Sequence, residues 1–217
     1  MTKKELVLRS MRALLGLAIC GTGTYLMLHA AIGLTPWETF RLGLSVKGGI
    51  SYGTATTLVG AVVVIMDLLL GERIGLGTIF DVFFTGRVVD FVAWLDLVPD
   101  PVNTAMSVVM LLLGMFILSF GQFFYMKAGL SCGPTDSFAV GVARRFKKLP
   151  FGLVNNTIMA IVLLLGALLG AQIGIGTIIG VCSIGVVQQS VFSTLRFDPR
   201  SVDQNGIRLQ LSPVRGA

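Results

Sequence analysis

Six long apolar stretches constrain the fold of this chain more than any other feature. Each stretch is long enough to cross about 30 Å of hydrocarbon as an α-helix that rises about 1.5 Å per residue. Only 13% of the residues are charged, whereas ordinary globular domains carry about 25%. The pattern predicts an all-α, multi-pass membrane protein and excludes a soluble enzyme, a secreted disulfide scaffold and a disordered chain. The predicted spans are residues 12–32, 53–70, 75–95, 104–126, 152–170 and 174–194.

An internal duplication divides the predicted membrane domain, with an offset of about 98 residues between the two copies. The clearest matched segments are 74–79 and 173–178, which read IGLGTI and IGIGTI. Pro36 and Pro134 open a second matched pair, PWETF and PTDSF. Each copy contains one long span, one short Pro-led segment and two further long spans. The expected parts of the chain are a basic N-terminus (1–11), repeat 1 (12–102), repeat 2 (103–195) and a polar tail (196–217).

The short segments, about 35–46 and 134–146, decide how often the chain crosses the membrane. If they cross, there are eight spans and the repeats are parallel; otherwise there are six and the repeats are inverted. Both schemes leave 14 of the 17 Lys and Arg residues inside and 2 outside, so both place the two termini in the cytoplasm. The first short segment covers only about 18 Å and carries Glu38 and Arg41, which are costly in hydrocarbon. We therefore expect six long transmembrane helices plus two short re-entrant or interfacial helices, in two inverted repeats.

Both short segments begin with helix start signals. Thr35 precedes Pro36, and Glu38 stands where a capping box requires an acidic residue. Gly133 and Asp136 repeat this layout in the second copy. Half-helices that start at membrane depth in matched positions are typical of transporter binding sites. Because acidic groups already occupy these positive helix ends, a cation, a proton or a substrate amine fits as well as an anion. The alternative is that Glu38 and Asp136 only cap helices at the water interface.

The third predicted span carries three charges, Asp81, Arg87 and Asp90, in otherwise apolar sequence. Unpaired at the bilayer centre, they would cost on the order of 9 kcal/mol together. Arg87 and Asp90 are three residues apart on one helix face and can pair, whereas Asp81 needs a partner on another helix. The second repeat has Gln189 at the position of Asp90. This asymmetry fits one repeat that binds a coupling ion or a charged substrate; the alternative is a structural ion pair that fixes helix order.

The remaining polar residues give weaker signals. His29 lies at a helix end and Asp67 near the end of its span, so we expect both at the headgroups. Asn155 starts the fifth span, where it could line a path. The three cysteines have no CxxC spacing, and two GxSxG matches lack the strand and the partnered histidine of a nucleophile elbow. We therefore expect no enzyme activity, no metal and no cofactor.

Several short motifs occur in the order that a known family of membrane proteins shows: GLTPW at 33–37, GL at 43–44, SYG at 51–53, GLGT at 75–78, Asp90, GPTD at 133–136 and ARR at 143–145. Through them the chain resembles the YczE branch of the YczE/YyaS/YitT family over about residues 12–195. The resemblance implies a bacterial multi-pass protein of the cytoplasmic membrane, in a family with no settled substrate or activity. Glu38 replaces an aspartate of the family pattern, and Asp81 replaces an amide.

These observations lead to a small secondary transporter or permease of an unknown small solute or ion, with its site between the two repeats. Trp37 would form a wall or gate beside that site. The alternative is a non-transporting accessory or scaffold protein for a membrane-associated pathway. The lipid bilayer is the expected partner, nucleic acid is not, and no oligomeric state is indicated. The candidate site residues are Trp37, Glu38, Asp81, Arg87, Asp90, Asp136, Asn155 and Gln189.

Overall fold

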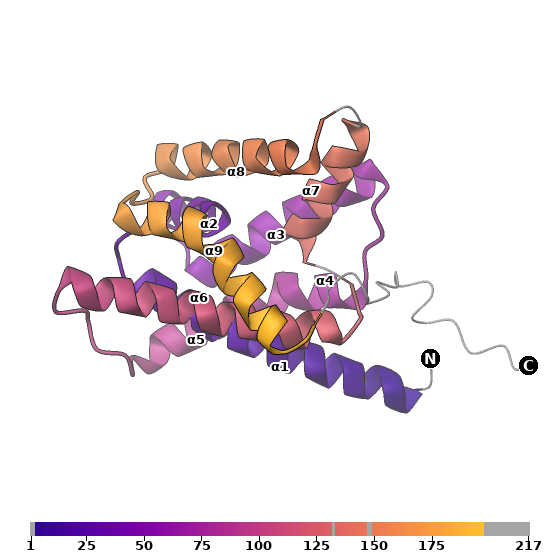
Figure 1. Ribbon diagram of the computed structural model, residues 1–217, viewed down its shortest axis with the longest axis horizontal. Helices are drawn as coiled ribbons and strands as arrows, with labels where there is room; N and C mark the ends of the chain where they lie inside the picture. The colour runs from indigo at the N-terminus through magenta and orange to yellow at the C-terminus, as the bar shows by residue number, and fades with distance from the viewer. Residues whose placement is uncertain (1–2, 132, 147–148, 198–217) are drawn as a thin grey trace, which may run out of the picture.

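The computed structural model of the protein describes residues 3–131, 133–146 and 149–197. Regular structure within these ranges is entirely helical, and α1, α6 and α8 lie lengthwise in the molecule (Figure 1). The all-α prediction is therefore confirmed, whereas most of the predicted tail, 198–217, lies outside the described residues. The elements are α1 (Lys3–His29), α2 (Pro36–Gly48), α3 (Tyr52–Leu70), α4 (Leu76–Phe80), the π-helical η1 (Asp81–Thr85), α5 (Gly86–Leu95), α6 (Thr104–Lys127), α7 (Pro134–Arg145), α8 (Phe151–Leu168) and α9 (Ile175–Thr194).

Five of these helices, α1, α3, α6, α8 and α9, are long and apolar enough to cross a membrane. They correspond to five of the six predicted spans. The other predicted span, 75–95, is a helical run in which the π-helical η1 separates α4 from α5. The wider π turn therefore divides this run into pieces that are each short. α1 begins at Lys3, so the predicted aqueous N-terminus is helical from that residue onward.

The connection between α2 and α3 is short and sharply turned. α2 begins after Thr35, but the predicted capping box does not form, because Thr35 makes no side-chain cap hydrogen bond and the Glu38 carboxylate has other partners. The helix ends at Gly49, whose φ of 61° lies in the left-handed region that glycine adopts without strain. Ser51 then caps α3 with its hydroxyl. This turn brings Tyr52, the first residue of α3, back beside α2.

α1 and α6 run antiparallel with their backbones in close contact. A Cβ atom on Gly16 would lie 2.8 Å from the Gly121 carbonyl oxygen, and one on Gly23 would lie 2.6 Å from the Gly114 carbonyl oxygen. Small residues at such positions let helices approach closely, which is how membrane helices gain packing contacts where lipid removes the hydrophobic driving force. The four glycines therefore fix this helix pair.

The segments that precede α7 and α2 each accept a backbone hydrogen bond from the beginning of a helix in the other half of the chain. The Gly77 amide donates to the Leu130 carbonyl at 3.0 Å, shortly before α7. The Gly176 amide donates to the Ile32 carbonyl at 2.8 Å, shortly before α2. The short helices also pack across the two halves, because α2 contacts α8 and α7 contacts α3. Each short helix is therefore positioned by the half of the chain to which it does not belong.

Candidate functional site

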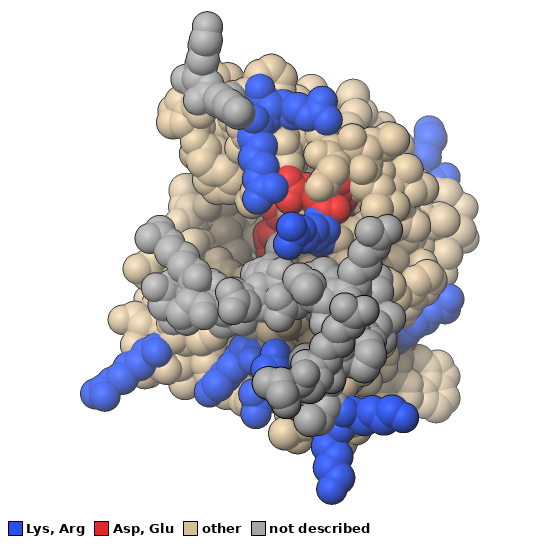
Figure 2. Space-filling model, turned by 90° about the vertical axis from the view of Figure 1, so that its right-hand side faces the viewer, with Lys and Arg blue, Asp and Glu red and all other residues tan. Residues whose placement is uncertain are grey.

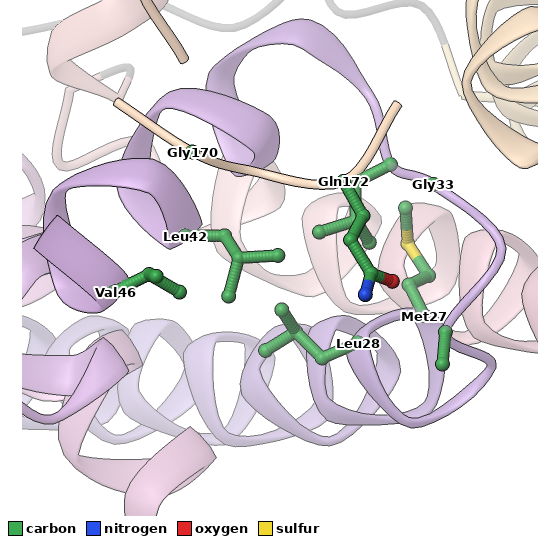
Figure 3. Close-up of a pocket in the computed structure, with 9 residues that line it drawn as sticks. Met27, Leu28, Gly33, Leu42, Val46, Gly170 and Gln172 are labelled. Atoms are coloured by element: carbon green, nitrogen blue, oxygen red, sulfur yellow. The ribbon is translucent and has the colours of Figure 1, made fainter. Parts of the chain in front are cut away.

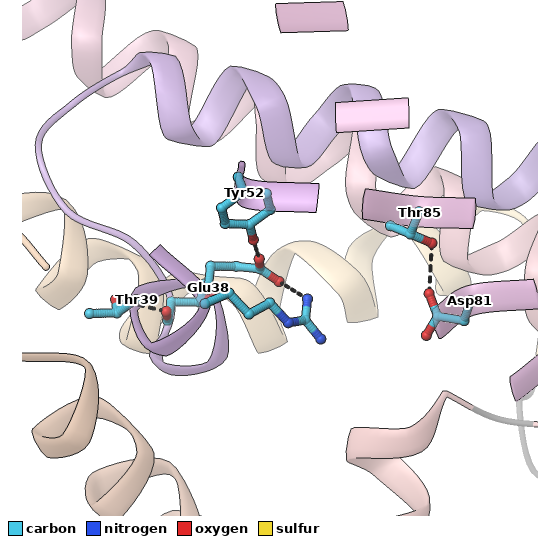
Figure 4. A network of polar contacts seen from close by, with 7 residues as sticks. Glu38, Thr39, Tyr52, Asp81 and Thr85 are labelled. Atoms are coloured by element: carbon cyan, nitrogen blue, oxygen red, sulfur yellow. Dashed lines mark hydrogen bonds and ion pairs between the residues drawn. The ribbon is translucent and has the colours of Figure 1, made fainter. Parts of the chain in front are cut away.

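A buried ion pair on α2 forms the centre of the candidate site. Glu38 and Arg41 are three residues apart, so their side chains lie on one face of this helix. Arg41 Nη1 donates to Glu38 Oε1 at 2.9 Å, and the side chains are only 13% and 10% exposed, respectively. The Tyr52 hydroxyl donates to the other Glu38 oxygen (Figure 4). The Glu38 carboxylate is thus held between a cation of its own helix and a hydroxyl of α3.

Two further carboxylates approach each other at the start of α7. Asp81 is the first residue of η1, and its Oδ1 atom accepts from Thr85 Oγ1 at 2.7 Å (Figure 4). A Cβ atom on Gly133 would lie 3.2 Å from Asp81 Oδ2 and 3.9 Å from Asp136 Oδ2. The glycine therefore leaves space between the two carboxylates. Asp81 thus accepts a hydrogen bond from Thr85 of its own helical run, and its carboxylate also lies near the start of α7.

Arg41 links the ion pair to these two carboxylates electrostatically. Its positive charge acts on both Asp81 and Asp136. Its Nε atom is buried and has no hydrogen-bond partner among the residues that the structure describes. The Arg41 guanidinium thus pairs with one carboxylate, acts electrostatically on two others, and still has a free donor. We call the following residues the polar cluster: Glu38, Arg41, Tyr52, Asp81 and Asp136.

The structure does not join Arg87 and Asp90 into the predicted ion pair. Asp90 accepts from Ser51 Oγ at 2.6 Å and from the Gly53 amide at 2.8 Å. Both donors lie at the start of α3, where backbone amides have no partner within the helix. Arg87 is exposed and forms no ion pair with any residue in the described ranges. Asp90 therefore caps α3, and the charge of Arg87 faces outward; any pathway role for either residue stays a prediction.

Three further candidate residues are not members of the polar cluster. The Trp37 ring meets the Phe138 ring of α7 edge-on, with centroids 6.5 Å apart, and so packs α2 against α7. Asn155 is half-buried on α8, and Gln189 is exposed on α9. Within the described part of the chain, no hydrogen bond or ion pair joins Asn155 or Gln189 to the polar cluster. The roles of Trp37 as a wall or gate and of the two amides stay predictions.

Sequence reasoning missed two members of the polar cluster. From the sequence, Arg41 lies on the first short helix and counts as one of the two basic residues outside the membrane, although its i,i+3 spacing from Glu38 indicates a pair on one helix face. Tyr52 gives no comparable signal, because it lies 14 residues from Glu38 and reaches it only through the turn between two helices. A local rule could thus have found Arg41, whereas Tyr52 required the tertiary structure.

Two neighbouring cavities share Leu28 and Leu42, and one of them reaches the polar cluster. The first has a volume of about 290 Å³, and apolar side chains of α1 and α2 together with Gln172 line it (Figure 3). The second has a volume of about 360 Å³ and is called the Tyr52 cavity below. Because Tyr52 lines it and also donates to Glu38, this residue connects the cavity with the buried ion pair. The Tyr52 cavity is lined by Tyr25, Leu28, His29, Leu42, Tyr52, Val89, Asp90 and Ala93.

The end of the molecule that carries the N-terminus presents a charged hollow. Figure 2 shows acidic side chains recessed in it and Lys and Arg side chains standing around it. At this end Arg144 Nη1 of α7 lies 3.0 Å from Glu72 Oε1 in the loop after α3. Asp136, at the start of α7, is exposed. One member of the polar cluster, Tyr52, therefore lines a cavity, and another, Asp136, is exposed.

The chain matches a family described as a family of unknown function (DUF6198) over residues 7–192. It belongs to this family. A Haemophilus influenzae protein described as uncharacterized is 29% identical to this DUF6198 chain over 176 residues, which are 81% of this chain and 79% of that protein. The uncharacterized membrane protein YczE of Bacillus subtilis is 27% identical over 189 residues, 85% of this chain and 86% of YczE. The uncharacterized protein YyaS of the same bacterium is 26% identical over 178 residues, 80% of this chain and 87% of YyaS.

These relatives confirm the resemblance that the short motifs indicated. No solved structure matches the chain. YczE is described as a membrane protein, and the DUF6198 chain has five helices able to span a bilayer. The chain is therefore a membrane protein with several apolar helices.

Proposed function

We propose that this DUF6198 protein is a small secondary transporter or permease of a small solute or ion, with its site at the polar cluster. One observation carries the proposal: Tyr52, which lines a cavity, contacts a buried Glu38–Arg41 pair, and the charge of Arg41 also acts on Asp81 and Asp136. Ionisable groups inside a membrane protein are costly and typically mark substrate, ion or proton pathways. The proposed location is the bacterial cytoplasmic membrane, with both termini inside.

A purely structural role explains the ion pair poorly. Glu38 and Arg41 belong to the same helix, so their attraction does not hold two helices together. The Tyr52 hydrogen bond does tie α2 to α3, but a neutral pair of residues could supply the same tie. Burying both charges is therefore costly and does little for helix order, which favours a functional reason for keeping them.

The arrangement of the two halves supports the proposal. α1 and α6, the first helices of the two predicted repeats, run antiparallel, as inverted repeats require. The hydrogen bond from Gly77 to Leu130 joins the first half of the chain to the second. The equivalent bond from Gly176 to Ile32 joins the second half to the first. Counting the run 76–95 as one crossing gives the proposed six. In transporters built from inverted repeats, the site lies between short helices at the repeat interface, which is where α2 and α7 begin.

The charges of the polar cluster favour a cation. The polar cluster holds three carboxylates and one guanidinium group, so an additional positive charge would balance the excess of acidic groups. An anion would find Arg41 already paired with Glu38. We therefore propose an inorganic cation, a proton or a small amine as the transported species, and a transport reaction without covalent catalysis.

Charge movement by purified protein on a solid-supported membrane tests this proposal. Wild-type proteoliposomes should give a transient current on addition of Na⁺, K⁺, ammonium or ethanolamine. Glu38→Gln should reduce the current roughly tenfold or more, because it leaves Arg41 buried without its partner. Lys47→Gln changes an exposed residue in the last turn of the same helix and should leave the current unchanged.

Two results would reject the permease. The first is a wild-type protein that moves none of the four cations and gives no current after a jump in pH. The second is an equal effect of Glu38→Gln and Lys47→Gln. If the first result came with a stable co-purifying protein, the accessory or scaffold function would take its place.

A further inference from the structure

Asp67 is a buried carboxyl group that the polar cluster does not use. It lies on α3, whose most apolar window has a mean hydropathy of 2.0, and its side chain is 0% exposed. Neither of its carboxylate oxygens has a hydrogen-bond partner among the described residues. Asp67 is therefore enclosed by protein; its predicted depth at the headgroups stays a prediction. An ionised carboxylate without a partner is strongly unfavourable in such a place, so burial favours the neutral, protonated form of this side chain.

The position of Asp67 follows from how α3 packs. Gly53 lies against Gly86 and Gly60 lies against Val82, so α3 runs antiparallel to the run from η1 to α5. Asp67 comes seven residues after Gly60, which places it about 10 Å further along α3. That end of α3 contacts α7, and it is the end at which the Glu72–Arg144 ion pair forms.

The charged neighbours of Asp67 do not neutralise it. Glu72 follows it in the chain, donates its backbone amide to the Asp67 carbonyl, and is itself paired with Arg144 of α7. Asp81 of η1 and Asp136 at the start of α7 are acidic as well. Glu38 of α2 and Asp90 of α5 contact the first residues of α3, at its opposite end. A negative charge on Asp67 would therefore be opposed by the negative charge of Glu72.

The matched junction in the second half of the chain has no ionisable group. Gly166 stands at the position that corresponds to Asp67, 99 residues later. A Cβ atom on Gly166 would lie 2.8 Å from the Phe40 amide nitrogen, so α8 and α2 contact each other directly there. A glycine is therefore sufficient for helix packing at the α2–α8 junction. Helix packing alone does not explain why the α3–α7 junction has a carboxyl group instead.

We propose that Asp67 is a proton-binding site, and that α7, held over it by the Glu72–Arg144 ion pair, must separate from α3 before the proton is released to water. A metal ion would need several further ligands, and no group of three or more His, Cys, Asp or Glu side chains in the described ranges could hold one. The use of this proton as a coupling ion rests on the proposed permease function; the binding site itself does not.

Infrared difference spectroscopy of the full-length protein in lipid nanodiscs tests the site. The carbonyl band of a protonated carboxyl group should disappear from the wild-type spectrum as the pH is raised. Asp67→Asn, which mimics the neutral form, should lack this band. Asp96→Asn is the matched control, because Asp96 is exposed and its left-handed φ of 47° suits asparagine equally well. It should keep the band.

A second measurement addresses the movement of α7. In D₂O the Asp67 band should shift slowly in the wild type. Arg144→Gln should speed this exchange roughly two- to fivefold, the change expected for loss of an ion pair in which the Arg144 side chain is exposed. A band that survives Asp67→Asn would overturn the proton site. Exchange that is equally fast in both proteins would overturn the role of α7. Neither readout requires transport, so failure of the permease proposal would be seen separately.

Discussion

Glu38 is the residue on which the candidate site depends, because both of its carboxylate oxygens are engaged. Arg41 supplies a charge-assisted hydrogen bond at 2.9 Å, and Tyr52 supplies a hydroxyl from the neighbouring helix. Hydrogen bonds to charged groups are among the stronger ones in proteins. Of these two interactions, only the Tyr52 hydrogen bond can be removed by a substitution that leaves the charges of the site unchanged.

Tyr52→Phe should therefore lower the free energy of unfolding by about 1.5–3 kcal/mol, the range for hydrogen bonds to charged groups. Thermal unfolding in detergent measures this change. Tyr25→Phe is the control, because the Tyr25 hydroxyl lies 3.5 Å from His29 Nδ1 and contributes a weak contact at most. Equal stability of the Tyr52→Phe variant and the wild type would show that the Glu38 carboxylate does not depend on this donor.

Residues of the site could be predicted from the sequence when they are charged and their neighbours in the chain are apolar. Glu38, Asp81 and Asp136 stand out in this way, whatever the packing of their helices. Their partners could not be predicted, since a partner is chosen by tertiary contact. Asp90 illustrates this: its spacing from Arg87 permits an ion pair, but the free amides at the start of α3 bind it instead.

At the scale of elements, the antiparallel contact of α1 with α6 orders the rest of the molecule. α2 and α7, which carry two of the acidic groups, follow directly from these two helices. The contact depends on glycines, because a Cβ atom on Gly121 would lie 2.6 Å from the Cys20 amide nitrogen. Such an approach leaves no room for even one methyl group.

Gly121→Ala should therefore destabilise the protein by about 1–3 kcal/mol through overpacking. Gly185→Ala makes the same change in α9, where nothing lies within 4 Å of the new atom. It should be neutral or stabilise the protein by up to about 1 kcal/mol, since alanine favours helix more than glycine does. Thermal unfolding of both variants compares them directly, and the opposite order of stability would contradict the described α1–α6 packing.

The helices themselves were largely predictable, because length and apolarity are properties of the sequence. The short helices α2 and α7 also begin at the predicted Pro36 and Pro134. The π-helical η1 was not predictable, since its extra residue per turn is fixed by packing and by the Thr85–Asp81 bond rather than by a local pattern.

At the scale of the whole molecule, the account depends on how the two halves face the membrane. Matched segments such as 74–79 and 173–178 indicate the duplication from sequence, but counting basic residues gives the same result for parallel and inverted halves. In the proposed inverted arrangement, the Tyr52 cavity and the charged hollow at the end that carries the N-terminus open toward opposite sides of the membrane. The polar cluster then lies on a path between them.

Labelling of single cysteines with a membrane-impermeant maleimide in intact cells tests this central claim most directly. The experiment uses a chain whose native cysteines are replaced by alanine and introduces Lys47→Cys, Arg73→Cys or Lys127→Cys at exposed positions. Inverted halves with six crossings predict labelling from outside at position 47, and labelling at positions 73 and 127 only after the cells are opened. The reverse pattern at all three positions would show eight crossings and parallel halves, and would contradict a path between the two sides through the polar cluster.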